Sequence, residues 1–215
     1  MTVREPVMRR LSEAFLDHGY DQLTMSGLAK LCGLTRRGLY HHFSNKEEAF
    51  RATIRAGNDR TRAESLAAGR QLLADGAGVL DILAGLLDVR YGNTRRRLSQ
   101  SPHAQELNDQ AFRSCRDIMV EAATQFQSDF AAFMMELVAH GHLALRPGYA
   151  VEELVQLLSD GARGINQTLP TLSPNQIAYR YRRMSEAILY GFAAPTHDAP
   201  ADQAQSIRMA SALSA

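Results

Sequence analysis

The chain has 215 residues, of which 45% are hydrophobic, and its formal net charge is +1. This length allows one large domain or two small ones, and the composition supports an ordinary globular core. The near-neutral charge excludes a protein that is basic throughout, so any nucleic-acid contact must be local, and no apolar run approaches the roughly 20 residues of a membrane span.

The N-terminal segment and the two cysteines indicate the compartment. Residues 1–11 are charged and lack the apolar core of a signal peptide. Cys32 and Cys115 are far apart in the sequence and lie on apolar helix faces, so we expect no disulfide framework. We therefore expect a cytoplasmic protein that has no membrane partner.

Residues 6–18 are predicted to form the first helix. Pro6 suits the first helical turn, and Gly19 follows as a C-terminal stop. The apolar stripe of this helix consists of Val7, Leu11, Ala14 and Phe15. We expect this stripe to close the core of a three-helix head, together with the two helices that follow.

Residues 24–46 have the pattern of two short helices joined by a tight turn. Thr24 is placed to cap the first helix, because a threonine hydroxyl accepts from the free N–H groups of a first turn. Gly33 ends this helix, since glycine adopts the left-handed backbone at little cost. Thr35 then caps a second helix over 36–43. This pattern predicts a helix-turn-helix, whose second helix docks in the major groove of DNA.

The charge of residues 24–46 supports DNA binding. The stretch contains no Asp or Glu, whereas ordinary protein surfaces intersperse both signs. Arginine suits guanine edges, while tyrosine, lysine and threonine suit phosphates. The alternative interpretation is a solvated helix face that happens to be basic. The candidate DNA-contacting residues are Thr24, Ser26, Thr35, Arg36, Arg37, Gly38, Tyr40, His41, His42 and Lys46.

A long helix is predicted to follow the helix-turn-helix. Ser44 or Asn45 caps it, Glu47 and Glu48 occupy its favoured acidic first turn, and it runs to about Ala74. Two glycines within four residues then break the chain. Beyond this break the sequence shows helical periodicity and no strand alternation.

The second half of the chain is predicted to be helical as well. An apolar stripe begins at residue 79, and the pattern predicts one long helix from Pro102 to about His140, followed by helices over 151–167 and 173–192. The arginines at 95–97 have two interpretations, a second DNA-binding patch or a solvated helix end. Residues 195–215 are small and polar, which indicates a flexible tail.

The run from Gly19 to Phe50 resembles the DNA-binding head of the TetR family of bacterial regulators. The matching features are Gly19-Tyr20, Thr24, Leu28-Ala29, Gly33-Leu34-Thr35, Leu39-Tyr40, His42-Phe43 and Lys46-Glu47. The family often has glycine and then threonine or alanine before the Leu-Tyr pair, where this chain has Arg37 and Gly38. We therefore expect Arg37 to supply a contact of its own.

The resemblance implies a homodimeric, ligand-responsive regulator of transcription, most often a repressor, that binds double-stranded operator DNA. It also implies that the last two helices form a four-helix interface with a partner chain. A small-molecule effector in the body would displace the linking helix and change the separation of the two heads. The apolar stripe that could contribute to the interface, or else to the core of one chain, consists of Ile177, Tyr181, Met184, Ile188 and Leu189.

These observations predict an all-α fold of about nine helices. We expect a helix-turn-helix head over residues 1–46, a helical ligand-binding and dimerisation body over 47–194, and the tail over 195–215. Arg163 and Asn166 are polar groups on an apolar helix, so they either orient a ligand or face solvent or the partner. The candidate wall of a ligand pocket consists of Leu83, Leu87, Cys115, Met119, Phe126, Arg163 and Asn166.

Patterns that carry catalysis are missing from the sequence. It has no Gly-x-Ser-x-Gly elbow, no phosphate-binding glycine loop and no His-Glu-x-x-His pair. His140 and His142 flank a glycine at a predicted helix end and lack obvious further ligands. We therefore expect neither an enzyme nor a metal or cofactor site. Two alternatives stay open: a dimeric DNA-binding protein that responds to no ligand, and an enzyme with an unrecognised site in the body.

Overall fold

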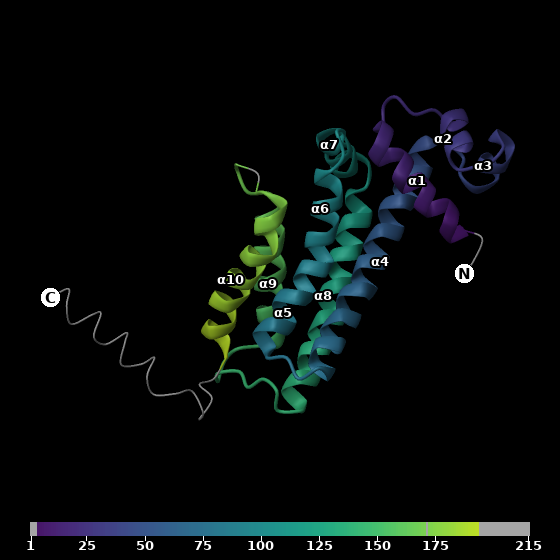
Figure 1. Ribbon diagram of the computed structural model, residues 1–215. Coiled ribbons are helices and arrows are strands. Elements are labelled where there is room, and N and C mark those ends of the chain that lie inside the picture. Colours follow the sequence, from purple (N-terminus) through teal and green to yellow (C-terminus); the bar gives the residue numbers. More distant parts are fainter. Residues whose placement is uncertain (1–3, 171, 194–215) are drawn as a thin grey trace.

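The computed structural model describes residues 4–170 and 172–193 (Figure 1). These residues form ten α-helices, a π-helical turn and a 3-10 turn, and they contain no strand, which confirms the all-α prediction. The predicted tail at 195–215 lies outside the described residues. The elements are α1 (Arg4–His18), α2 (Met25–Leu31), α3 (Arg36–His42), α4 (Lys46–Ala74), α5 (Val79–Leu87), η1 (Asp88–Gly92), α6 (Asn93–Ser99), α7 (Ala104–Ser114), α8 (Arg116–Ala139), α9 (Val151–Asn166), η2 (Pro174–Gln176) and α10 (Ile177–Phe192).

Two hydrophobic cores hold these helices together. The head core lies between α1, α2, α3 and the start of α4, and it also takes apolar side chains from α7 and α8. The body core lies between α5, α8, α9 and α10. Among the fully buried side chains are Leu11, Leu28, Leu39 and Phe50 of the head and Ile82, Leu86, Phe126, Phe130 and Tyr181 of the body. Because α7 and α8 enter the head core, the head is packed against the body.

The long helix α4 runs from the head along the length of the body, with α8 beside it (Figure 1). Its predicted cap is observed, since the Asn45 side chain accepts from the Glu48 N–H at 2.8 Å. At Gly69 the helices approach closely, because an added Cβ would lie 3.0 Å from Leu86 and 3.1 Å from Phe133. A larger side chain there would push α4 away from α5 and α8.

The prediction of one helix from Pro102 to His140 is wrong. The chain forms α7 and α8, separated at Cys115, whose φ of −128° leaves the helical region. The carbonyl of Ser114 accepts from the Arg51 guanidinium at this break. A single non-helical residue barely alters the spacing of apolar positions, so the periodicity gave no sign of it.

The stripe assigned to dimerisation is mostly core of a single chain. Ile177, Tyr181 and Leu189 are buried among α5, α9 and α10, and only Met184 and Ile188 are partly exposed. The exposed large side chains of these helices are instead Leu157, Tyr179 and Tyr190. These exposed side chains, rather than the predicted stripe, are therefore the candidate surface for a partner chain.

The arginines at 95–97 lie on α6 and are all half-buried. Arg96 donates to both carboxylate oxygens of Asp88, at 2.8 and 2.9 Å, and to the side chain of Asn93. Burial lowers the pKa of Arg97. This segment is therefore held within the body rather than projecting as a free basic patch.

Candidate nucleic-acid interface

Two threonine caps fix the helices of the head. The Thr24 hydroxyl accepts from the Gly27 N–H at 3.1 Å, and the Thr35 hydroxyl accepts from the Gly38 N–H at 3.0 Å. Each bond satisfies a backbone donor that the first turn of a helix leaves free. Because Leu39 is fully buried between these helices, α3 can turn only one face to solvent.

The turn between α2 and α3 is held from two sides. Gly33 has φ +69°, a conformation in which other residues are strained, and the Leu34 N–H reaches back to the Ala29 carbonyl at 2.8 Å. From α1, the Arg10 guanidinium donates to the Cys32 carbonyl at 2.8 Å. These contacts set the angle between α2 and α3 before any DNA is present.

The outer face of α3 is basic and exposed. Arg36, Arg37, Tyr40, His41 and His42 all lie at the surface, and they make no ion pair within the part of the chain that the structure describes. A shallow hollow runs along this face and includes Thr35 and Gly38. The Arg36 guanidinium lies 5.5 Å from the centre of the Tyr40 ring. This face offers uncompensated positive charge to an external anion.

The remaining predicted DNA residues have different surroundings. Thr24 and Ser26 are exposed at the start of α2. Lys46 is only half-exposed, because its Nζ donates to the Tyr20 carbonyl at 2.8 Å and lies 4.2 Å from the centre of the Tyr20 ring. Lys46 therefore fastens α4 to the corner after α1, a structural role that the sequence did not indicate.

A carboxylate of the body also fastens this corner. One oxygen of Glu106, on α7, accepts from the backbone N–H groups of Tyr20 at 2.7 Å and Asp21 at 2.6 Å. The bond from the Asp21 N–H is the main cause that lowers the pKa of Glu106. Gly19 makes room for this contact, since an added Cβ would lie 2.4 Å from the other Glu106 oxygen. Sequence reasoning missed Glu106, because its partners lie 86 and 85 residues away.

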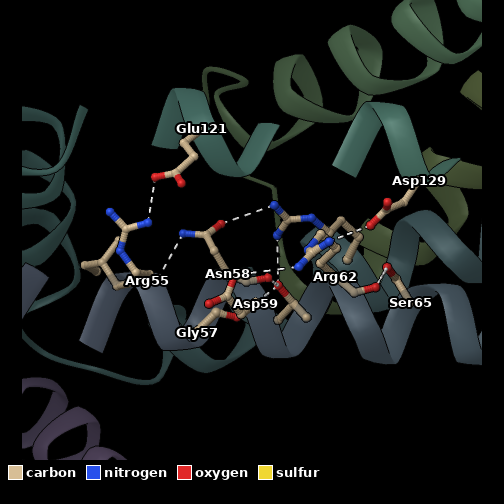
Figure 2. A network of polar contacts seen from close by, with 11 residues as sticks. Arg55, Gly57, Asn58, Asp59, Arg62, Ser65, Glu121 and Asp129 are labelled. Carbon is tan, nitrogen blue, oxygen red and sulfur yellow. Dashed lines mark hydrogen bonds and ion pairs between the residues drawn. The ribbon is translucent and has the colours of Figure 1, made fainter. Parts of the chain in front are cut away.

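Ion pairs along α4 fasten the linking helix to α8. The pairs are Arg51–Asp117, Arg55–Glu121, Arg62–Asp129 and Arg70–Glu136. Figure 2 shows two of them, with Glu121 reaching Arg55 and Asp129 reaching Arg62 across the gap between the helices. The Arg51 guanidinium lowers the pKa of Asp117 to about 2. From one pair to the next, the residue numbers increase along both helices. The two helices α4 and α8 therefore run parallel and are joined at several points along their length.

The structure brings together only some of the predicted pocket residues. Leu83, Leu87 and Phe126 share the body core, whereas Cys115 belongs to the head core. Met119 is partly buried on α8. Cys115 is therefore separated from the apolar residues with which it was grouped.

Arg163 and Asn166 are half-buried on α9. Asn166 accepts from the Tyr181 hydroxyl at 2.7 Å. Arg163 pairs through Nη2 with Asp160, while its Nη1 is buried without a hydrogen-bond partner in the described residues. Arg163 therefore has one unused donor, Nη1, whereas the side-chain oxygen of Asn166 already accepts a hydrogen bond.

Sequence reasoning also missed Arg90, a buried arginine in η1. Only 6% of its surface is exposed, and it reaches across to Thr61 and Asn58 on α4. A signal for it exists in the sequence, because Arg90 continues the inward-facing series of Val79, Ile82, Leu83 and Leu86 at a step of four.

The described residues contain no group of three His, Cys, Asp or Glu side chains placed to share a metal ion. His140 and His142 are both exposed at the end of α8. No helix in this part of the chain combines the length and apolar character that crossing a membrane would need.

Comparison with known proteins identifies the same head. A family model described as bacterial regulatory proteins, tetR family, matches residues 11–53. The chain is 27% identical over 85 residues to the HTH-type transcriptional repressor AcnR of Corynebacterium efficiens, a match that spans 40% of each chain. It is 35% identical over 52 residues to AcnR of Corynebacterium diphtheriae, covering 24% of this chain and 27% of the relative. These sequence matches thus span well under half of each curated relative.

Solved structures extend the likeness to the whole fold. A TetR-family transcriptional regulator from Rhodococcus superposes with a TM-score of 0.63 at 17% identity, covering 86% of this chain and 98% of that one. SmeT, the repressor of the Stenotrophomonas maltophilia multidrug efflux pump SmeDEF, gives a TM-score of 0.61 at 17% identity, with 93% and 95% covered. The matched segment contains the two capped helices and their basic face, so residues 11–53 carry the DNA-binding head of the tetR family of bacterial regulatory proteins. The solved structures show that the body follows in the same fold as theirs.

Proposed function

We propose that this protein is a homodimeric regulator of transcription that binds operator DNA through α3 and leaves it when a small molecule binds the body. The observation that carries the proposal is the exposed, acid-free face of α3, held by two caps and a buried leucine. Arg36 and Arg37 read base edges at the start of α3, and Tyr40 contacts phosphate further along. Repression is supported by the names of AcnR and SmeT, both of which are repressors.

Selection from random double-stranded DNA tests this proposal. The full chain should enrich one motif made of two related half-sites, because a two-fold dimer presents two copies of α3. Log affinity for the selected sequence should fall linearly with log salt concentration, as phosphate contacts require. A selection that enriches no sequence, with binding to no DNA at low salt, would contradict the proposal.

The dimer surface of this proposal is the exposed side of α9 and α10, which lies on the far edge of the body from α4 (Figure 1). Leu157 and Tyr190 are 42% and 64% exposed there, and large apolar side chains at a surface favour a partner. Light scattering should give a dimer at micromolar concentration, and Leu157→Glu or Tyr190→Glu should shift it toward monomer. Val120→Glu, at an exposed site on α8, serves as the matched control. A wild-type monomer at this concentration would rule out the two-headed mechanism.

Release from DNA depends on α4, which joins the head to the body. A ligand can shift the equilibrium only if it prefers the geometry that fits DNA poorly. Supporting this role, α4 carries the ion pairs to α8 and contributes side chains to both ends of the molecule. DNA affinity that no small molecule changes would point instead to a dimeric DNA-binding protein without an effector.

A further inference from the structure

Arg90 is a buried cation that pairs with no acidic side chain in the part of the chain that the structure describes. Its Nη1 donates to the Thr61 hydroxyl at 2.8 Å and its Nη2 to the Asn58 amide oxygen at 3.2 Å, both neutral groups of α4. Its Nε is buried and donates to nothing among the described residues. Arginine stays protonated in proteins, and a buried charge left without a counter-charge is strongly destabilising. The positive charge of Arg90 is therefore not balanced by a carboxylate of the described residues.

Within the described residues, the acidic side chains of the neighbouring helices do not pair with Arg90. Four acidic side chains of η1, α8 and α9 pair with arginines other than Arg90, and these are Asp88, Glu121, Asp129 and Asp160. Burial is the main cause that lowers the pKa of Arg90; the positive charges of Arg62 and Arg163 act in the same direction, while Tyr91 and Asp59 act against them. Asp59 is exposed and lies 4.0 Å from Arg62, so it does not pair directly with Arg90.

Further unused donors lie on the neighbouring helix α9. Ser159 is fully buried and its hydroxyl has no hydrogen-bond partner in the described residues. Arg163 holds Asp160 with Nη2 and leaves Nη1 buried and unpartnered. Burial raises the pKa of Tyr91, and both side chains lie close enough to its phenol to act on that pKa in the opposite direction. Tyr91 thus connects the unused donors of α9 to Arg90, its neighbour in the chain.

Aromatic rings form the apolar side of this site. The Arg90 guanidinium lies 5.2 Å from the centre of the Tyr91 ring and 5.1 Å from that of Phe126. The two rings meet edge to face, with centroids 5.8 Å apart. Guanidinium N–H groups and a hydroxyl match the oxygens of a carboxylate, and rings beside them suit an attached apolar group.

We propose that Arg90, Ser159 and Arg163 bind the carboxylate of a small effector, whose apolar part lies against Tyr91 and Phe126. The inference rests on the proposed function only in naming this molecule as the effector. An open cleft of about 270 Å³ between α4 and α8 lies on the other side of Asn58, which lines the cleft and accepts from Arg90. Entry of an effector from this cleft therefore requires Asn58 to move.

The site acts directly on the linking helix. A carboxylate that engages Arg90 competes with Asn58 and Thr61 for the same guanidinium, and these two residues are what joins Arg90 to α4. Figure 2 shows Asn58 and Arg62 on the side of α4 that faces Glu121 and Asp129 of α8. Effector binding therefore weakens one attachment of α4 to the body, while the ion pairs to α8 stay in place.

Binding of model carboxylates to the full-length chain tests the assignment. Acetate, hexanoate and benzoate are titrated by calorimetry, and the melting temperature is followed in parallel. Benzamide has the shape of benzoate without its charge, and inorganic phosphate is an oxyanion without an apolar part. We expect hexanoate or benzoate to bind and to raise the melting temperature, with benzamide and phosphate at least tenfold weaker. If no carboxylate binds, or if benzamide or phosphate binds equally well, the proposal is wrong.

Variants then locate the bound carboxylate. Arg90→Met and Arg163→Gln should each weaken the binding at least tenfold, and Ser159→Ala by a smaller factor. Arg60→Met is the matched control, because Arg60 is exposed on α4 and its one ion pair within the described chain is with Glu64. If Arg90→Met does not fold, Arg163→Gln and Ser159→Ala decide the question. Wild-type affinity in Arg163→Gln and in Arg90→Met, or in Ser159→Ala where Arg90→Met fails, would overturn the assignment.

DNA binding by the same samples separates this proposal from the proposed function. Fluorescence anisotropy with the selected DNA, or with random DNA at low salt, is measured with and without benzoate. Carboxylate binding that needs Arg90 in a protein without DNA affinity supports the site and contradicts the regulator. DNA affinity in a protein that binds no carboxylate supports the regulator and contradicts the site.

Discussion

Arginines of α3 and arginines of α4 carry the same charge but differ in what holds them. Arg36 and Arg37 are exposed and have no acidic partner within the described residues. Arg51, Arg55 and Arg62 on α4 each meet a carboxylate of α8 at 2.6 Å or less. Unpaired charge on a rigid face is available to an outside partner, whereas paired charge is used within the fold. The count of arginines alone would not distinguish these two helices.

Arg90 differs from both of these groups of arginines. Arg90 is buried like the side chains of the core, and, like Arg36 and Arg37, it pairs with no acid among residues 4–170 and 172–193. On α3, solvent and counter-ions compensate the charge until DNA arrives. Inside the body solvent is excluded, and the aromatic rings and neutral acceptors around Arg90 leave room for the proposed carboxylate as its counter-charge.

The largest effect is expected from removing the buried anchor of α3. Leu39 is fully buried, so Leu39→Ala should lower the free energy of unfolding by about 2–5 kcal/mol through lost burial and the cavity left behind. Leu31→Ala, at a side chain that is 43% exposed on α2, should change it by less than about 0.5 kcal/mol. Denaturant unfolding measures both, and equal midpoints would show that α3 is not anchored through Leu39.

An intermediate effect is expected at the free arginines. Arg36→Ala or Arg37→Ala should cost roughly 1–3 kcal/mol in the preference for the selected DNA over random DNA, because each loses a base-edge contact. Neither should change the melting temperature. Arg60→Ala, on α4, should leave the preference intact. Binding isotherms at several salt concentrations measure it, and full preference in both α3 variants would mean that sequence is read elsewhere.

The smallest effect is expected at the ion pairs of α4, which solvent screens. The pKa of Asp117 falls from 3.8 to about 2 beside Arg51. A depressed carboxyl pKa adds stability that is fully present above its ordinary value, so this contribution should disappear as the pH falls from 3.8 toward 2.

Asp117→Asn removes the ionisable group and should flatten that part of the stability curve. Asp109→Asn, at an exposed carboxylate of α7 that contacts Gln105, is the control. Melting temperatures between pH 2 and pH 5 report the difference. The pair would be irrelevant to acid stability if both variants followed the wild-type curve.

Local interactions let the sequence by itself determine the head. Thr24, Thr35 and Asn45 each cap a helix by accepting from a backbone N–H three residues on, and Gly33 takes the left-handed conformation that its position requires. Such bonds depend on neighbours in the chain, so a pattern of residue types is enough to predict them. The basic face of α3 follows from the same helical spacing.

Only the tertiary structure decided the features that depend on distant residues. The break at Cys115, the hold of Glu106 on the Tyr20 corner and the burial of Ile177, Tyr181 and Leu189 in one chain all require knowing which helices meet. Arg90 is the clearest case, since its partners lie 29 and 32 residues away on α4. Periodicity can show that a residue points inward, but whether a buried charge meets an acid depends on which helix packs across from it.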